Sequence, residues 1–258
     1  MKLKTLLTPA ELPALVDRDL TSTCCVVFDV LRATSTFVTA LHHGADAIIP
    51  VCEIAEARAI HGQHPDYLLA GERNGMKIRG ATPADKDFAL GNSPREFTRD
   101  LVQGRTIVST TTNGTRALRA CRGARTVLAG SFLNLTATAR FIHHRPPETI
   151  LLVCAGTGDA MALEDVMAAG ALTEVLLNKA ILPDSQGEPA GHACDATEMA
   201  RQVYVQAREN WPAVLQISKN ARRLLGIPEL HDDVAFCARL DLYPLVAGMT
   251  IDGSLRRL

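Results

Sequence analysis

The chain has 258 residues, a formal net charge of −1 and a hydrophobic fraction of 47%, while aromatic residues make up only 4%. These values are typical of a globular protein and give no reason to expect nucleic acid or an anionic membrane as a partner. No segment contains the ~20 consecutive apolar residues that a transmembrane helix needs. The N-terminal stretch MKLKTLLTPAELPALVDRD does not resemble a signal peptide. We therefore expect a cytoplasmic protein without a membrane partner.

A unit of a short apolar run, a polar loop and a helix-like segment occurs three times along the chain. The runs are TCCVVFDV (23–30), RTIVST (105–110) and TILLVCAG (149–156). Further strands are predicted at DAIIPVC (46–52), YLLAGE (67–72) and RTVLAGS (125–131). Runs that are apolar on both faces and alternate with amphipathic helices indicate an α/β fold, with a mainly parallel sheet that is covered on both sides.

The second half of the chain is predicted to be mostly helical. Helical spacing is present in VMAAGALTEVLLNK (166–179), ATEMARQVYVQARENW (196–211) and VLQISKNARRLLG (214–226), and LPDSQGEPAGHAC (182–194) is predicted as a surface loop. The stretch HHRPPET (143–149) has two prolines and no periodicity. We predict one domain over residues 1–258, with two closely packed lobes meeting near 143–149.

The seven cysteines are scattered and contain no C-x-x-C pair or zinc-module spacing. Free, buried thiols are the simplest interpretation. Cys154 ends a predicted strand and could act as a nucleophile only with a nearby base and a lowered pKa. No histidine is placed near it along the chain, so a cysteine-dependent transferase is an alternative that we do not favour.

Polar residues follow the predicted strands, where the carboxyl ends of parallel strands would bring them into one crevice. Asp29 ends the first run, and Arg32 follows it. A carboxylate at the end of a buried strand needs a cation, a metal or backbone donors to stay charged. The alternative is a carboxylate that only caps the next helix.

The loop STTTNGT has the residues of an anion site at a helix start, where free N–H groups and the helix dipole favour negative charge. Glycine there permits close approach or positive φ. The alternative is a plain helix cap. The candidate contacts in this loop are Thr111, Thr112, Asn113, Gly114, Thr115 and Arg116.

Three further clusters follow strands or precede helices. Glu72 and Arg73 lie in AGERNGMKIRG, where a solvated turn is the alternative. Asn92 and Ser93 lie in LGNSP, which by itself indicates a turn or a helix start. Glu164–Asp165 begins a helix, where the pair either complements the helix dipole or provides Mg²⁺ ligands. Together, anion-holding loops and carboxylates suggest a phosphate-ester substrate and a divalent metal.

The motifs FDVLRATST, GERNG, LGNSP, TTTNGT, GSFLN, CAG and LEDVMAAG stand in the order found in the 2-phosphosulfolactate phosphatase (ComB) family, and the later HDDVAFCARLD resembles its ending. The resemblance implies a three-layer α/β/α fold around a mixed, mainly parallel sheet. It also implies Mg²⁺-dependent hydrolysis of 2-phosphosulfolactate to 3-sulfolactate and phosphate, a step of coenzyme M biosynthesis. The implied partner is a small anionic phosphate ester, and a homodimer is the expected assembly.

Residue roles follow from position in the matching motifs. Asp29 and Glu72 become the expected catalytic or metal-binding carboxylates, joined at the metal by Glu164 and Asp165. The resemblance implies that the substrate contacts are Arg32, Ser35, Arg73, Asn92, Ser93, Thr111, Thr112, Asn113, Gly114, Thr115 and Arg116.

The chain departs from the family pattern at the inserted ATPADKD (81–87), at Ala89, where an acidic residue is usual, and at SKNARRLLG (218–226), where an Arg-His-Gly-like turn is common. These departures bear on the substrate, so another small phosphorylated acid and a non-catalytic organophosphate sensor stay open as alternatives. Leu31 takes the place of the second aspartate of the D-x-D signature of aspartyl-phosphate enzymes. We therefore favour attack by water over attack by Asp29.

Overall fold

The structure is a computed structural model that describes residues 1–80, 87–178 and 192–258. Most of the predicted insertion at 81–87 and of the predicted surface loop at 182–194 therefore lies outside the described residues. Within these ranges, no helix has both the length and the apolar character needed to cross a membrane.

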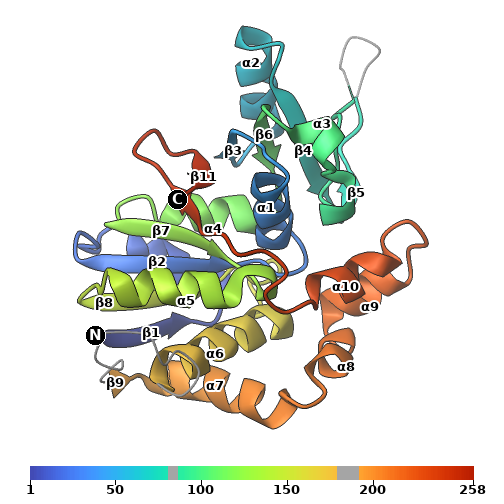
Figure 1. The fold of residues 1–258 in the computed structure, drawn as a ribbon. Coiled ribbons are helices and arrows are strands. Elements are labelled where there is room, and N and C mark those ends of the chain that lie inside the picture. The colour runs from blue at the N-terminus through green and yellow to red at the C-terminus, as the bar shows by residue number, and fades with distance from the viewer. Residues whose placement is uncertain (81–86, 179–191) are drawn as a thin grey trace.

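Eleven strands form one mixed sheet in the described part of the chain, with helices on both of its faces (Figure 1). In chain order the strands are β1 (Lys2–Leu6), β2 (Thr23–Phe28), β3 (Ala47–Val51), β4 (Leu68–Arg73), β5 (Met76–Lys77), β6 (Thr106–Thr110), β7 (Thr126–Gly130), β8 (Thr149–Cys154), β9 (His192–Ala193), β10 (Ala247–Met249) and β11 (Leu255–Arg257).

The helices of the two outer layers follow the strands along the chain. They are α1 (Ala33–His42), α2 (Ile54–Gln63), α3 (Arg99–Val102), α4 (Gly114–Ala120), α5 (Leu135–His144), α6 (Leu163–Leu177), α7 (Asp195–Ala207), α8 (Trp211–Gln216), α9 (Lys219–Leu225) and α10 (His231–Cys237). Short 3-10 helices are η1 (Pro9–Leu15), η2 (Pro94–Glu96) and η3 (Phe132–Asn134).

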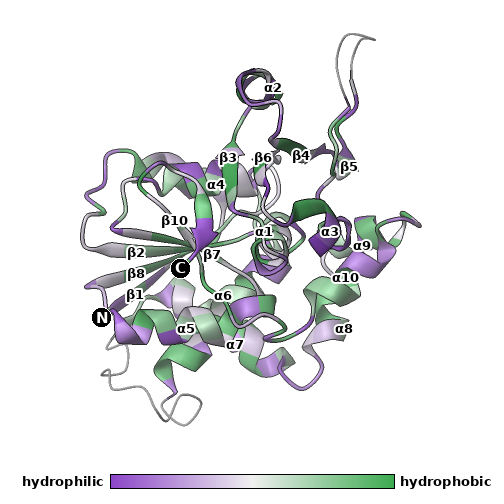
Figure 2. Ribbon diagram, turned by 45° about the horizontal axis from the view of Figure 1, so that its top comes forward, coloured by the Kyte–Doolittle hydropathy of each residue, from purple (hydrophilic) through white to green (hydrophobic). Residues whose placement is uncertain are grey.

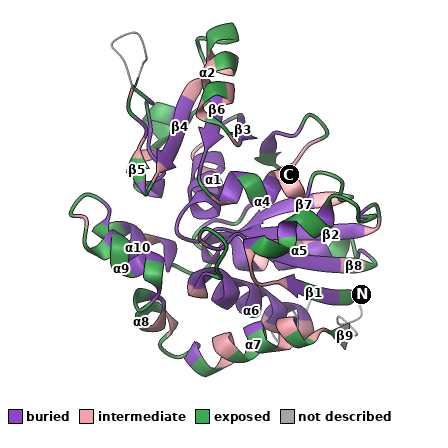
Figure 3. Cartoon of the chain, turned by 180° about the vertical axis from the view of Figure 1, so that it is seen from behind, coloured by how far each residue is buried: buried purple, intermediate pink, exposed green. Residues whose placement is uncertain are grey.

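Strand β2 shows why the sheet is covered on both sides. All six of its residues are buried (Figure 3), and alternate side chains enter different cores. Val26 and Phe28 pack with α5 and α6 on one face, while Cys25 and Val27 pack with α1 and α4 on the other. The outer helices α5 and α7 mix hydrophobic and hydrophilic residues along their length (Figure 2), as expected for helices with one face against the core. The predicted three-layer α/β/α fold is confirmed.

The sheet order is β5-β4-β6-β3-β11-β10-β7-β2-β8-β1-β9. It contains two groups of parallel strands, β4-β6-β3 and β7-β2-β8-β1-β9. The antiparallel hairpin β10–β11 joins the groups, since β10 pairs with β7 and β11 pairs with β3, both antiparallel. The β4-β6-β3 group stands at a steep angle to the other group, so the carboxyl ends of both point to the same central region (Figure 1).

The strands predicted from apolar runs are confirmed within one or two residues at their ends. The last predicted helix, over 214–226, is instead divided into α8 and α9. The break occurs because Ser218 adopts an extended conformation and its side chain accepts a hydrogen bond from the Ala221 N–H, which starts a new helix. Residues 143–149 connect the end of α5 to β8, and the two lobes stay a prediction.

Candidate active site

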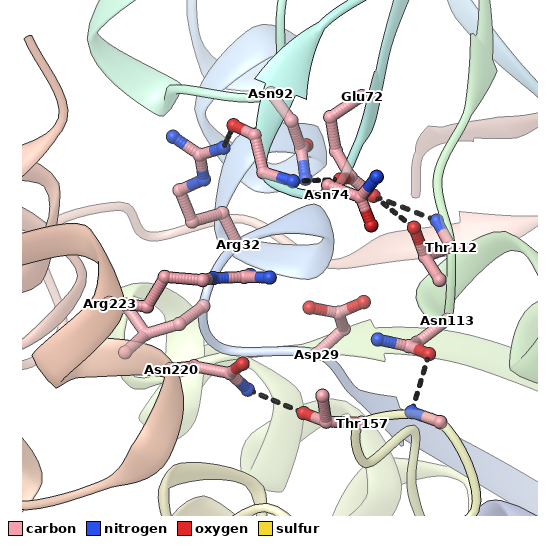
Figure 4. A pocket seen from close by; sticks show the side chains of 13 residues that line it. Asp29, Arg32, Glu72, Asn74, Asn92, Thr112, Asn113, Thr157, Asn220 and Arg223 are labelled. Atoms are coloured by element: carbon pink, nitrogen blue, oxygen red, sulfur yellow. Dashed lines mark hydrogen bonds between the residues drawn. The ribbon is translucent and has the colours of Figure 1, made fainter. Parts of the chain in front are cut away.

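One polar cavity of about 220 Å³ lies where the loops after β2, β4, β6 and β8 meet helix α9 (Figure 4). Six of the residues predicted from the sequence line it, together with seven that were not predicted. The lining residues are Asp29, Leu31, Arg32, Glu72, Asn74, Gly75, Asn92, Thr112, Asn113, Thr157, Gly158, Asn220 and Arg223.

Asp29 follows the last residue of β2 and is only 7% exposed. Its Oδ1 accepts a hydrogen bond from the Ala33 N–H at 3.2 Å, and the Gly114 N–H also donates to its carboxylate. Burial, together with the charges of Glu72 and Glu164, raises the pKa of Asp29 to about 7, although the two backbone donors lower it. The carboxylate therefore both accepts a hydrogen bond at the start of α1 and faces the cavity. Asp29 is a helix cap and a cavity residue at once.

Gly114 starts α4 directly against Asp29. A Cβ at this position would lie 2.6 Å from Oδ2 of Asp29 and 2.7 Å from Cβ of Ala33. Close approach, rather than positive φ, is therefore the reason for a glycine here.

Glu72 connects two of the loops that build the cavity. Its Oε1 accepts hydrogen bonds from the N–H and the hydroxyl of Thr112, both at 2.8 Å, and its Oε2 accepts one from the Gly75 N–H at 2.6 Å. Asn74 and Gly75 form the two-residue turn between β4 and β5, with φ values of 56° and 80°. This Asn-Gly pair is typical of a tight hairpin, so the turn could have been predicted from the sequence.

Arg32 lines the cavity, but its charge is already paired. It donates from Nη1 to Oδ2 of Asp233 at 2.7 Å and from Nη2 to the Gly75 carbonyl oxygen at 2.6 Å. Oδ1 of Asp233 accepts a hydrogen bond from the Ser93 hydroxyl at 2.6 Å. Asp233 is fully buried on α10, so the C-terminal motif HDDVAFCARLD fixes one wall of the cavity from behind.

Helix α9 contributes two side chains that the sequence analysis did not identify. Asn220 donates from Nδ2 to Oγ1 of Thr157 at 2.7 Å and to Oε1 of Glu164 at 2.6 Å. Arg223 extends its guanidinium into the cavity on the side of Asp29 (Figure 4). Both residues lie far along the chain from the strand-end loops, and no local pattern connects them.

Several predicted substrate contacts lie outside the cavity because their polar atoms bond elsewhere. The hydroxyl of Ser35 donates to the Val30 carbonyl at 2.8 Å. Arg73 donates to three backbone carbonyls and to the Thr110 hydroxyl. Thr111 and Thr115 exchange hydrogen bonds at 3.3 Å, as a helix cap does. The predicted contacts that do not line the cavity are Ser35, Arg73, Ser93, Thr111, Gly114, Thr115 and Arg116.

The second carboxylate pair does not line this cavity either. Asp165 is 2% exposed, and its two oxygens accept hydrogen bonds from the Val30 N–H at 2.8 Å and the Gly156 N–H at 3.0 Å. Glu164 is 1% exposed and accepts from Asn220. In residues 1–80, 87–178 and 192–258, no three His, Cys, Asp or Glu side chains gather in a metal-binding arrangement. Of the four carboxylates predicted as metal ligands, Asp29 and Glu72 line the cavity and Glu164 and Asp165 do not, and their roles at a metal stay predictions.

Cys154 is fully buried at the end of β8. Burial, with smaller effects from nearby carboxylates, raises the pKa of its thiol well above the ordinary value. A thiol that is neither exposed nor readily ionised is a poor nucleophile, which counts against the cysteine-dependent alternative.

The sequence comparisons agree with this geometry. The family model described as 2-phosphosulpholactate phosphatase matches residues 10–250. A protein of Caldanaerobacter subterraneus subsp. tengcongensis is 38% identical over 234 residues, which is 89% of each chain. Proteins of Thermotoga maritima, 38% identical over 87% of this chain and 88% of its own, and of Synechococcus sp., 39% identical over 90% and 91%, are similar. Each bears the name probable 2-phosphosulfolactate phosphatase. The chain therefore belongs to the 2-phosphosulfolactate phosphatase family, a family of phosphoric monoester hydrolases.

Proposed function

We propose that this chain hydrolyses 2-phosphosulfolactate to 3-sulfolactate and phosphate and that the reaction requires Mg²⁺. The observation that carries the proposal is the convergence of Asp29 and Glu72, from two different strand ends, on one small polar cavity. The names of the relatives supply the substrate, and the cavity supplies the chemistry that such a substrate needs.

The donor set of the cavity fits Mg²⁺. Mg²⁺ prefers oxygen ligands and is commonly bound by one or two carboxylates together with substrate phosphate oxygens. Asp29 and Glu72 would hold the ion, and the Asn92 amide lines the same cavity. When bound, Mg²⁺ would draw charge from the phosphoryl oxygens and stabilise the transition state.

The charges around the cavity give a second reason for a cation. When ionised, the lining residues Asp29 and Glu72 carry two negative charges, and the lining residues Arg32 and Arg223 carry two positive ones. A polyanionic ester would therefore enter a cavity whose walls are not net positive. A divalent ion beside Asp29 and Glu72 would make the walls net positive.

Only part of the STTTNGT loop is available to the phosphoryl group. The Thr112 hydroxyl donates to Glu72, so its role is to hold that carboxylate. The side-chain oxygen of Asn113 accepts from the Gly158 N–H at 3.4 Å, while its amide nitrogen points toward Asp29 (Figure 4). Asn113 would donate to a phosphoryl oxygen, as expected for a group that stabilises developing charge.

The nucleophile is proposed to be water. Water would add to phosphorus as the ester P–O bond breaks, and the leaving oxygen would take up a proton to become the hydroxyl of 3-sulfolactate. Leu31 stands where an aspartyl-phosphate enzyme of the D-x-D type has its second aspartate. Mass spectrometry of acid-quenched enzyme tests this step, because a phosphorylated Asp29 would contradict attack by water.

The first experiment is inorganic phosphate release from racemic 2-phosphosulfolactate with Mg²⁺, repeated with EDTA. We expect release that EDTA abolishes and that Mg²⁺ restores. If the enzyme releases phosphate only from another small phosphorylated acid, the proposed substrate is wrong but the phosphatase activity is confirmed. Tight binding without release, by a folded sample with Mg²⁺, would instead favour the organophosphate sensor. A role in coenzyme M biosynthesis rests on the same substrate, and a homodimer stays a prediction.

A further inference from the structure

Arg223 differs from the other arginines near the cavity in having no protein partner. It is exposed on α9, lines the cavity and forms no hydrogen bond or ion pair with any residue in the described ranges. Its guanidinium nonetheless points into the cavity rather than away from the molecule (Figure 4). A cation in this position contributes little to the fold and is available to a ligand.

The other candidate cations are already engaged. Arg32 pairs with Asp233 and donates to the Gly75 carbonyl. Arg73 donates hydrogen bonds to backbone carbonyl oxygens and to the Thr110 hydroxyl, and it does not line the cavity. Arg116 lies outside the cavity lining. Among the described residues, Arg223 is therefore the cavity-lining cation that has no anionic partner.

Arg223 enters the cavity from a different element than the two carboxylates (Figure 4). Asp29 and Glu72 come from strand ends, whereas Arg223 comes from a helix on another side of the cavity. A Cβ at Gly75 would lie 3.5 Å from the guanidinium, an ordinary van der Waals distance, so the Arg223 guanidinium lies beside the β4–β5 turn.

We propose that Arg223 determines substrate specificity by binding a second anionic group, a carboxylate or sulfonate, of a phosphate ester whose phosphoryl group lies beside Asp29 and Glu72. This inference rests on the proposed function. A guanidinium offers parallel N–H donors that match the oxygens of such a group, and its charge strengthens those hydrogen bonds. An ester without a second anion would gain nothing from Arg223.

The test compares three esters on one carbon skeleton: 2-phosphosulfolactate, 2-phospholactate, which lacks the sulfonate, and isopropyl phosphate, which lacks both anions. We expect Arg223→Gln to lower kcat/KM for 2-phosphosulfolactate by roughly 10- to 100-fold, mainly through KM, because charged hydrogen bonds are lost. Isopropyl phosphate should change by less than about threefold. The loss with 2-phospholactate shows whether the carboxylate is the group that Arg223 binds.

Two variants control the experiment. Arg222 is the exposed neighbour that does not line the cavity, so Arg222→Gln should leave all three esters unchanged. Arg223→Lys should raise the KM for 2-phosphosulfolactate less than Arg223→Gln does, because lysine keeps the positive charge but lacks the planar guanidinium. Thermal unfolding of Arg223→Gln should match the wild type, since no partner is lost.

An equal loss with all three esters would overturn the inference, because Arg223 would then act on the phosphoryl group itself. The failure of the proposed function is visible separately, as a wild-type enzyme that does not hydrolyse 2-phosphosulfolactate. In that case the affinity for 3-sulfolactate, measured by calorimetry, still tests whether Arg223 binds the second anionic group. Weaker binding to Arg223→Gln than to Arg222→Gln supports it, and equal binding contradicts it.

Discussion

The two pairs of buried carboxylates, Asp29 with Glu72 and Glu164 with Asp165, lie at the same end of the molecule but do different work. All four side chains are at most 7% exposed. Glu72 and Asp165 each have a backbone donor on both oxygens, yet Asp29 and Glu72 line the cavity, whereas Glu164 and Asp165 do not. Burial and backbone hydrogen bonds therefore do not distinguish the two pairs. The cavity lining does.

The largest expected effect comes from the pair that faces the cavity. Asp29→Asn and Glu72→Gln each remove a charge. The amide at position 29 keeps an oxygen for the Ala33 N–H, whereas the amide at position 72 keeps an acceptor for only one of the N–H groups of Thr112 and Gly75. We expect kcat/KM to fall by roughly 10²–10³-fold or more, as for other groups that stabilise a developing charge. Circular dichroism should show a retained fold. Activity within tenfold of the wild type in either variant would remove that residue from the catalytic set.

The pH dependence of stability should distinguish Asp29 from an ordinary surface carboxylate. Its pKa is about 7 in the folded protein against 3.8 as the ordinary value. Between these values the folded protein holds a proton that the unfolded chain has released, so the free energy of unfolding falls as pH rises. Asn carries no such penalty. Relative to wild type, Asp29→Asn should therefore gain stability from pH 4 to pH 8, by at most about 4 kcal/mol.

Urea unfolding of both proteins in EDTA at pH 4, 6 and 8 measures this difference. EDTA is needed because a bound cation would favour the ionised carboxylate and hide the penalty. Parallel stability curves for the two proteins would mean that Asp29 has an ordinary pKa and that burial does not control its ionisation.

Asp165 should matter for stability rather than for chemistry. Its oxygens satisfy the buried N–H groups of Val30 and Gly156 and so connect the loops after β2 and β8. Asp165→Ala leaves both donors without an acceptor, at a cost of about 2–4 kcal/mol. Urea unfolding measures the loss, and kcat per folded molecule should stay near the wild-type value. A stable variant that needs a much higher Mg²⁺ concentration for half-maximal rate would instead restore Asp165 to the metal site.

The strands were predictable because they are buried on both faces and read as continuous apolar runs. The hairpin β10–β11 was not, since each strand has only three residues and its place between β3 and β7 depends on the rest of the sheet. Sequence reasoning expected the loops to meet along one edge of parallel strands. They meet instead because two parallel groups, joined by that antiparallel hairpin, are turned toward each other (Figure 1).

The residues of the site were likewise predictable only where local sequence determines their position. Asp29, Glu72 and Asn113 were predictable because each lies within three residues of the carboxyl end of a strand, and strand ends fix direction. Hydroxyl residues in the same loops, such as Thr111, were harder to assign because they can bond locally and turn away from the cavity. The sequence marked residues 218–226 as a departure from the family pattern but did not single out Arg223, because its position depends on how α9 packs against loops that are more than sixty residues away along the chain.

The smallest effect is expected for a substitution of Glu164, and it gives the most direct test of the difference between the two carboxylate pairs. Glu164→Gln keeps an oxygen for the Asn220 amide and removes a charge that helps to raise the pKa of Asp29. The pKa of Asp29 should then fall, so any limb of the pH–rate profile that reports its ionisation should move to lower pH. The Mg²⁺ concentration for half-maximal rate should change by less than about threefold, because Glu164 lies outside the cavity and would not hold the ion. A large rise in that concentration, comparable to the one expected for Glu72→Gln, would contradict the division between the two pairs, since it would make Glu164 a ligand despite its hydrogen bond to Asn220.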